Sequence, residues 1–221
     1  MRVRRLRTLV CVLAMLFALA PIRAGCASDA VTQDEASELL DAQSRSEYAL
    51  LIGVDHFVSR ADTYPSSTNN VNAMQEVFQG ALNPFRAIIV PPNPVTTVEQ
   101  LTALVQKTFG AAGKNDVCYL YLSTHGVYDP ASGQEPLLLL SDGQTENGIT
   151  PAQLEAAFDG ILGTKVIILD ACNSGAFIGK GLPSLPQEVH FLGDDFKVLT
   201  SSGALEESWY WSVDDQNESG M

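Results

Sequence analysis

Basic side chains are the scarcest feature of this 221-residue sequence. It has 13 Lys and Arg residues against 26 Asp and Glu residues, a formal net charge of −13. Five arginines lie in the first 24 residues, so the rest of the chain has 13 − 5 = 8 basic and 26 acidic side chains, a charge of −18. Such a chain repels phosphate backbones and anionic membrane surfaces. We therefore expect no nucleic-acid partner.

A hydrophobic run long enough to cross a membrane is also missing near the N-terminus. The apolar stretch there covers residues 8–20, whereas a spanning helix needs about 20 residues. It follows four arginines and precedes small residues, which is typical of a secretory signal peptide. We predict a signal peptide over residues 1–24 and an exported protein, periplasmic or extracellular, with no stable membrane insertion after cleavage. Lipoprotein anchoring at Cys26 is disfavoured, because Arg23 stands where a lipobox has an aliphatic residue.

Cysteines are too few for a disulfide framework. Beyond the predicted signal peptide they are Cys26, Cys118 and Cys172. Cys118 lies inside an apolar run and is expected to be a buried small side chain. Cys172 follows an apolar run instead, and an unpaired thiol there in an exported protein is a candidate catalytic group.

The length suits one α/β domain with additional segments. We predict a polar spacer over residues 25–47, the domain over 48–213, and a polar tail or truncated end over 214–221. Strand-like runs alternate with amphipathic patterns, which predicts a predominantly parallel sheet flanked by helices on both faces. The expected strands are residues 48–54, 87–90, 116–123, 166–169 and 196–200, with a hairpin or edge strand at 137–140. The expected helices are residues 71–78, capped by Asn69 or Asn70, 97–109, and one opening at Thr150-Pro151.

Two of the predicted strands end in reactive side chains. The unbroken apolar run 166–169 is typical of a strand buried on both faces, and it leads to Asp170 and Cys172. The strand 116–123 leads in the same way to His125, which precedes Cys172 by 172 − 125 = 47 residues. That spacing leaves room for a helix and a return strand. Because parallel strands end at one edge of a sheet, we expect these side chains to meet there.

The run Asp170-Ala171-Cys172-Asn173-Ser174-Gly175, with His125-Gly126 upstream, resembles the metacaspase-like branch of the caspase clan, peptidase family C14. The resemblance covers residues 48–207. It implies the caspase-like fold and a cysteine endopeptidase in which Cys172 attacks a peptide carbonyl and His125 accepts and then donates the proton. It also implies an oxyanion site on the backbone N–H groups of Cys172 and Gly126. Cys172 and His125 would thus act as a catalytic dyad, and no third catalytic residue is evident.

The same resemblance bears on which residue precedes the cleaved bond, the P1 residue. An aspartate at the position of Asp170 lines the P1 pocket in metacaspase-like enzymes and favours Arg or Lys. Ser123, the last residue of the neighbouring strand, is a second candidate substrate-binding residue. The family's further acid in this pocket is missing, because the matching segment is Asn70-Val71-Asn72-Ala73. This departure counts against a basic P1 residue, and the expectation of one rests on Asp170 alone.

The sequence leaves several alternatives open. Arg60 could select an acidic P1 residue instead, and Glu206 or Glu207 could restore acidity to the pocket. His56 also follows a predicted strand and could support the reactive residues without contacting the substrate, and His190 lies in an irregular loop. The chemistry requires no cofactor, although acid pairs could bind activating calcium, at residues 194–195 and 214–215. The chain could also be a non-catalytic caspase-like binding domain, or an unrelated α/β protein with coincidental motifs.

Overall fold

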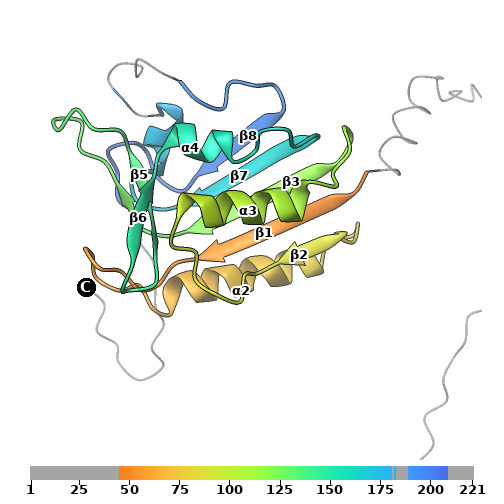
Figure 1. The fold of residues 1–221 in the computed structure, drawn as a ribbon, viewed down its shortest axis with the longest axis horizontal. Coiled ribbons are helices and arrows are strands. Elements are labelled where there is room, and N and C mark those ends of the chain that lie inside the picture. The colour runs from red at the N-terminus through yellow and green to blue at the C-terminus, as the bar shows by residue number, and fades with distance from the viewer. Residues whose placement is uncertain (1–44, 181, 183–188, 209–221) are drawn as a thin grey trace, which may run out of the picture.

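A parallel sheet of five strands forms the centre of the molecule (Figure 1). The structure is a computed structural model that describes residues 45–180, 182 and 189–208. The strand order is β2-β1-β3-β7-β8. The strands are β1 (Glu47–Gly53), β2 (Ala87–Ile89), β3 (Val117–Ser123), β7 (Thr164–Asp170) and β8 (Phe196–Thr200). The predicted strands are thus confirmed, whereas the predicted signal peptide and tail lie outside the described residues.

Helices cover both faces of this sheet, as predicted (Figure 1). The helices α3 (Val98–Phe109) and α4 (Pro151–Ala156) pack on one face, where Leu101 and Leu154 join the larger core cluster. On the other face, α2 (Ser66–Gln79) packs Val71 against a smaller cluster that includes Tyr121 of β3. None of the described helices combines the length and hydrophobicity needed to cross a membrane.

The strand that precedes Cys172 is less buried than its sequence suggests. Ile167 and Leu169 are fully buried beneath α3 and α4. Val166 and Ile168 are only partly buried, because α2 covers the second face and packs mainly on β1, β2 and β3. The prediction of burial on both faces was therefore wrong for this second face. Asp170 continues the partly covered row, which leaves its carboxylate accessible from that side.

A small antiparallel sheet follows β3 directly. It consists of β4 (Gly126–Val127), β5 (Leu137–Ser141) and β6 (Glu146–Ile149). Leu138 and Leu140 are fully buried in the larger core cluster, which anchors this sheet to the main one. The sequence predicted only the leucine run, because β4 has two residues and β6 has no apolar alternation. The tight pairing of β4 with β5 fixes the chain immediately after His125.

The helix α2 begins at Ser66, five residues before the predicted start. Its cap comes from Asp55, just beyond β1, whose carboxylate accepts the N–H groups of Ser67 at 2.9 Å and Thr68 at 3.0 Å. A carboxylate at a helix N-terminus satisfies free N–H groups and interacts favourably with the helix dipole. The predicted caps, Asn69 and Asn70, are consequently both inside the helix, and the Asn70 side chain is available for another contact.

The other two helices start where the sequence predicts. Thr97 accepts the N–H of Gln100 at the start of α3. Thr150 and Gln153 form a reciprocal capping box at the start of α4. These caps lie next to the helices they start, which is why the sequence shows them.

Candidate active site

The pairing of β3 with β7 brings the two predicted reactive residues to one edge of the sheet. Ser123 lies opposite Asp170 in the ladder, and the N–H of Thr124 donates to the Asp170 carbonyl at 3.1 Å. The chain beyond these strands carries His125 and Cys172, which line the same two cavities. A coincidental occurrence of the two motifs would not give this arrangement.

A main-chain carbonyl orients the His125 ring. The Nε2 atom of His125 lies 2.9 Å from the carbonyl oxygen of Ala61, which can only accept a hydrogen bond. Nε2 therefore carries the proton, and Nδ1 of the neutral ring holds the free lone pair. The ring also packs on Phe57, with centroids 4.4 Å apart. Nothing in the sequence indicated Ala61, because a contact made by a main-chain carbonyl does not depend on residue type.

Gly126 allows the chains of the two reactive residues to touch. A Cβ atom at residue 126 would lie 1.7 Å from the carbonyl oxygen of Cys172. The N–H of Leu139 donates to the His125 carbonyl. Hydrogen-bonded and non-hydrogen-bonded pairs alternate along an antiparallel ladder, so the next pair, Gly126 with Leu138, is not hydrogen-bonded. The Gly126 N–H therefore points away from β5. The N–H of Cys172 donates to no residue within the described ranges.

The segment that follows β8 encloses the Cys172 loop. Asn173 has a left-handed backbone with φ of 55°, and its N–H donates to the Glu206 carbonyl at 2.8 Å. The hydroxyl of Ser202 donates to the Ala171 carbonyl at 2.9 Å. At Cys172 itself, the N–H of Ser208 lies 3.4 Å from Sγ. This support comes from residues 201–208, which no motif in the sequence links to the thiol.

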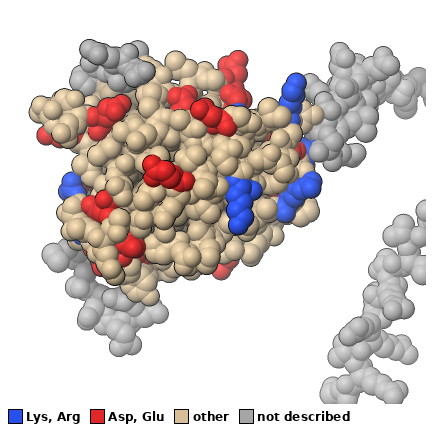
Figure 2. Space-filling view, viewed as in Figure 1, with Lys and Arg blue, Asp and Glu red and all other residues tan. Residues whose placement is uncertain are grey.

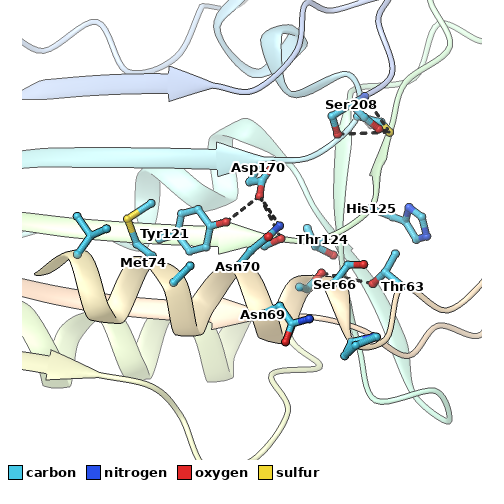
Figure 3. Close-up of a pocket in the computed structure, with 16 residues that line it drawn as sticks. Thr63, Ser66, Asn69, Asn70, Met74, Tyr121, Thr124, His125, Asp170 and Ser208 are labelled. Atoms are coloured by element: carbon cyan, nitrogen blue, oxygen red, sulfur yellow. Dashed lines mark hydrogen bonds between the residues drawn. The ribbon is translucent and has the colours of Figure 1, made fainter. Parts of the chain in front are cut away.

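Asp170 forms the polar floor of the first cavity, which has a volume of about 530 Å³. Its Oδ2 atom accepts hydrogen bonds from Asn70 Nδ2 at 3.0 Å, from the Tyr121 hydroxyl at 2.7 Å and from the Ser123 hydroxyl at 3.3 Å (Figure 3). Burial, and then the hydrogen bond to Asp170, raise the pKa of Tyr121, so its hydroxyl stays protonated and donates. Asn70, one of the two residues wrongly predicted to cap α2, makes this contact instead.

The acidity of the first cavity depends on Asp170. Among the described residues that line it, Asp170 is the sole acidic side chain. Ala73 lines the cavity where the family pattern has its second acid, and Met74 and Val77 add apolar wall. The carboxylate of Glu206 accepts a hydrogen bond from the N–H of Gly203 at 2.8 Å. Glu206 lines neither of the two cavities that His125 and Cys172 line.

A second cavity, of about 520 Å³, opens on the other side of the two reactive residues. Arg60, Tyr128 and Glu207 line it, together with His125 and Cys172. Arg60 and Glu207 thus lie away from the Asp170 floor. The structure therefore does not support the alternative in which Arg60 selects the P1 residue of the Asp170 cavity, nor the one in which Glu207 adds acidity to that cavity.

The remaining histidines lie elsewhere. His56 pairs with Asp62, with 2.9 Å between Nδ1 and Oδ2, and lines a separate cavity. His190 pairs with Glu155 at 3.0 Å, also outside both dyad cavities. Within the described ranges, no three His, Cys, Asp or Glu side chains gather as a metal site. Asp195 pairs with Lys165, residues 214–215 lie outside the described ranges, and calcium binding stays a prediction.

Comparison with a family model agrees with this architecture. No curated protein matches the chain. A solved structure, that of protein GSU0716 from Geobacter sulfurreducens, is 21% identical over 59% of this chain and 51% of that one, with a TM-score of 0.44. The match thus spans about half of that protein's length. A family model, the caspase domain of peptidase C14, matches residues 46–219. With this match and its helix-flanked parallel sheet, the chain belongs to the peptidase C14 caspase-domain family and has a caspase-like fold.

Proposed function

We propose that this protein is a cysteine endopeptidase that cleaves peptide chains after a basic residue. The observation that carries the proposal is the first cavity, where a thiol, an imidazole and one carboxylate face the same space. The carboxylate of Asp170 would bind the P1 side chain, and Cys172 would attack the carbonyl beside it. The acidic side chains scattered over the face in Figure 2 also suit a basic substrate.

In the proposed mechanism the Cys172 Sγ attacks the peptide carbonyl carbon, while Nδ1 of His125 accepts the thiol proton. The Ala61 carbonyl holds Nε2–H and so keeps Nδ1 as the atom that accepts the proton. The N–H groups of Cys172 and Gly126 would bind the oxygen that becomes negative. Collapse of this intermediate breaks the C–N bond, and Nδ1 returns the proton to the leaving amine. A water molecule, deprotonated at Nδ1, then hydrolyses the thioester, releasing the acid and restoring the thiol.

The two cavities give the substrate a direction. Because His125 and Cys172 line both cavities, a peptide with its P1 side chain above Asp170 would place the leaving segment in the second cavity. Ser208 now lies at the sulfur, where the scissile carbonyl must enter. The substrate must therefore displace this residue before the reaction can begin.

That contact also favours a second candidate function. A thiol covered by its own chain suits a caspase-like domain that binds or scaffolds without catalysis. In this case Ser208 would stay at Cys172 in the working protein. The two functions differ in whether reduced, folded protein hydrolyses any peptide.

The test is hydrolysis of fluorogenic peptides with Arg, Lys or Asp at P1, with calcium or with a chelator. We expect cleavage after basic residues, lost in Cys172→Ala, and reduced about 100-fold or more in His125→Ala. Asp170→Asn should lose the basic preference. The matched control is His56→Ala, because His56 is an exposed histidine outside the site. If reduced, folded wild-type protein cleaves none of the peptides under either condition, the binding domain is the better account.

A further inference from the structure

The two oxygen atoms of Asp170 have different surroundings. Oδ2 accepts three hydrogen bonds, from Asn70, Tyr121 and Ser123. Oδ1 accepts none from the described residues, and it is not among the enclosed polar atoms that lack a partner. Only Oδ1 is therefore available to a ligand in the cavity.

This asymmetry matters for arginine. A carboxylate oxygen offers about two lone-pair sites, so three donors occupy Oδ2 fully. The strong arginine–carboxylate pair is bidentate and uses both oxygens at once. In this cavity an arginine could reach Oδ1 alone and would lose the second of its parallel hydrogen bonds. Since Ala73 stands where a second acid is expected, no other carboxylate of the described lining residues can replace that bond.

A lysine ammonium suits the same surroundings better. It is a compact charge with three donors and needs acceptors around one point. Asn70 and Ser123 both bond to Oδ2, so the amide oxygen of Asn70 and the hydroxyl oxygen of Ser123 lie close to the carboxylate and can add acceptors for the ammonium beside Oδ1. The apolar wall of Met74 and Val77 can cover the lysine stem.

We infer that the Asp170 cavity selects lysine over arginine at P1, and that the donors on Oδ2 determine this choice. The inference rests on the proposed function, since it specifies the substrate of that same cavity. Losing one charge-assisted hydrogen bond corresponds to about a tenfold difference, so kcat/KM for a P1-Lys peptide should exceed that for the matched P1-Arg peptide by about tenfold.

The experiment compares two peptides that differ only at P1, with wild-type protein and with the double variant Tyr121→Phe/Ser123→Ala. The variant leaves Asn70 as the single donor on Oδ2, which reopens a site for arginine and removes one acceptor for lysine. The Lys/Arg ratio should fall toward one. The matched control, Tyr119→Phe/Ser46→Ala, makes the same chemical changes away from the cavity. Tyr119 is on the same strand and packs against Phe78 and Phe85.

The outcomes separate the two proposals. A lysine preference in the wild type that falls in the cavity variant, but not in the control, supports the inference. An arginine preference or equal cleavage in the wild type overturns it and leaves a basic-specific peptidase. A lysine preference that the cavity variant retains removes the role assigned to the donors on Oδ2. If neither peptide is cleaved, the proposed function itself fails. The wild-type ratio needs no variant to fold.

Discussion

Replacing Gly126 with alanine should inactivate the protein while leaving most of its fold intact. The added Cβ would lie 1.7 Å from the Cys172 carbonyl oxygen, whereas a close carbon–oxygen contact is about 3.3 Å. The chain segments carrying His125 and Cys172 would have to separate by about 3.3 − 1.7 = 1.6 Å. The backbone φ angle of Gly126 is not in the positive range that only glycine adopts easily. Alanine at this position therefore adds a steric clash and no backbone strain.

The expected effect on activity follows from that separation. A displacement of about 1 Å in a reacting group can reduce the rate about 100-fold, so Gly126→Ala should lower kcat by at least about that factor. The measurement is kcat and KM on a P1-Lys peptide, with thermal unfolding followed by circular dichroism. We expect a much larger loss of kcat than the accompanying loss of stability would explain.

Two glycine variants serve as controls. In Gly113→Ala the new Cβ meets its nearest atom, the Asp116 carboxylate, at an ordinary 3.6 Å. In Gly148→Ala it meets the Leu137 side chain at 2.9 Å, in the same small sheet but away from Cys172. If Gly126→Ala were as active and as stable as Gly113→Ala, the inferred contact between the two segments would be wrong. If Gly148→Ala lost activity equally, general disturbance of the small sheet would be the cause.

Two further predictions concern titrating groups away from the dyad. The hydrogen bond from Lys165 lowers the pKa of Asp195 below its ordinary 3.8, so this ion pair stabilises the fold above about pH 4 and its contribution is lost as the pH falls through the lowered pKa. Asp195→Asn should lower the urea midpoint of unfolding at neutral pH, and this midpoint should then fall less on acidification than that of the wild type. An equal fall of the midpoint in both proteins would contradict this. Burial raises the pKa of Cys118 to about 12, so its thiol should resist iodoacetamide at about pH 8 until the chain unfolds. Peptide mapping that finds Cys118 modified as fast as Cys172 in native protein would refute it.

The sequence was sufficient to bring His125 and Cys172 together. Both follow apolar runs whose ends must meet at one edge of a parallel sheet, so their proximity depends on strand order and little else. The cap residues Thr97 and Thr150 were also predictable, because each contacts a residue three positions away. Local patterns and simple topology account for these successes.

The remaining parts of the site depend on contacts between distant segments. The start of α2 is set by Asp55, which is 66 − 55 = 11 residues before Ser66, so the local pattern placed the helix too late. Asn70 consequently changed from a cap to a partner of Asp170. Ala61 and Ser208 act largely through main-chain atoms, which the residue type does not encode.

The register of β3 against β7 has a consequence for chain length. Seven residue pairs, from Val117 with Thr164 to Ser123 with Asp170, fix how far each strand extends beyond its neighbour. Inserting one residue within β7 would turn Asp170 to the opposite face, because side chains alternate along a strand. Residues added between β4 and β5 would lengthen the chain between His125 and Cys172 and leave both in place. Relatives with the same site can therefore differ widely in the 47-residue interval, provided that the length changes fall outside the ladder.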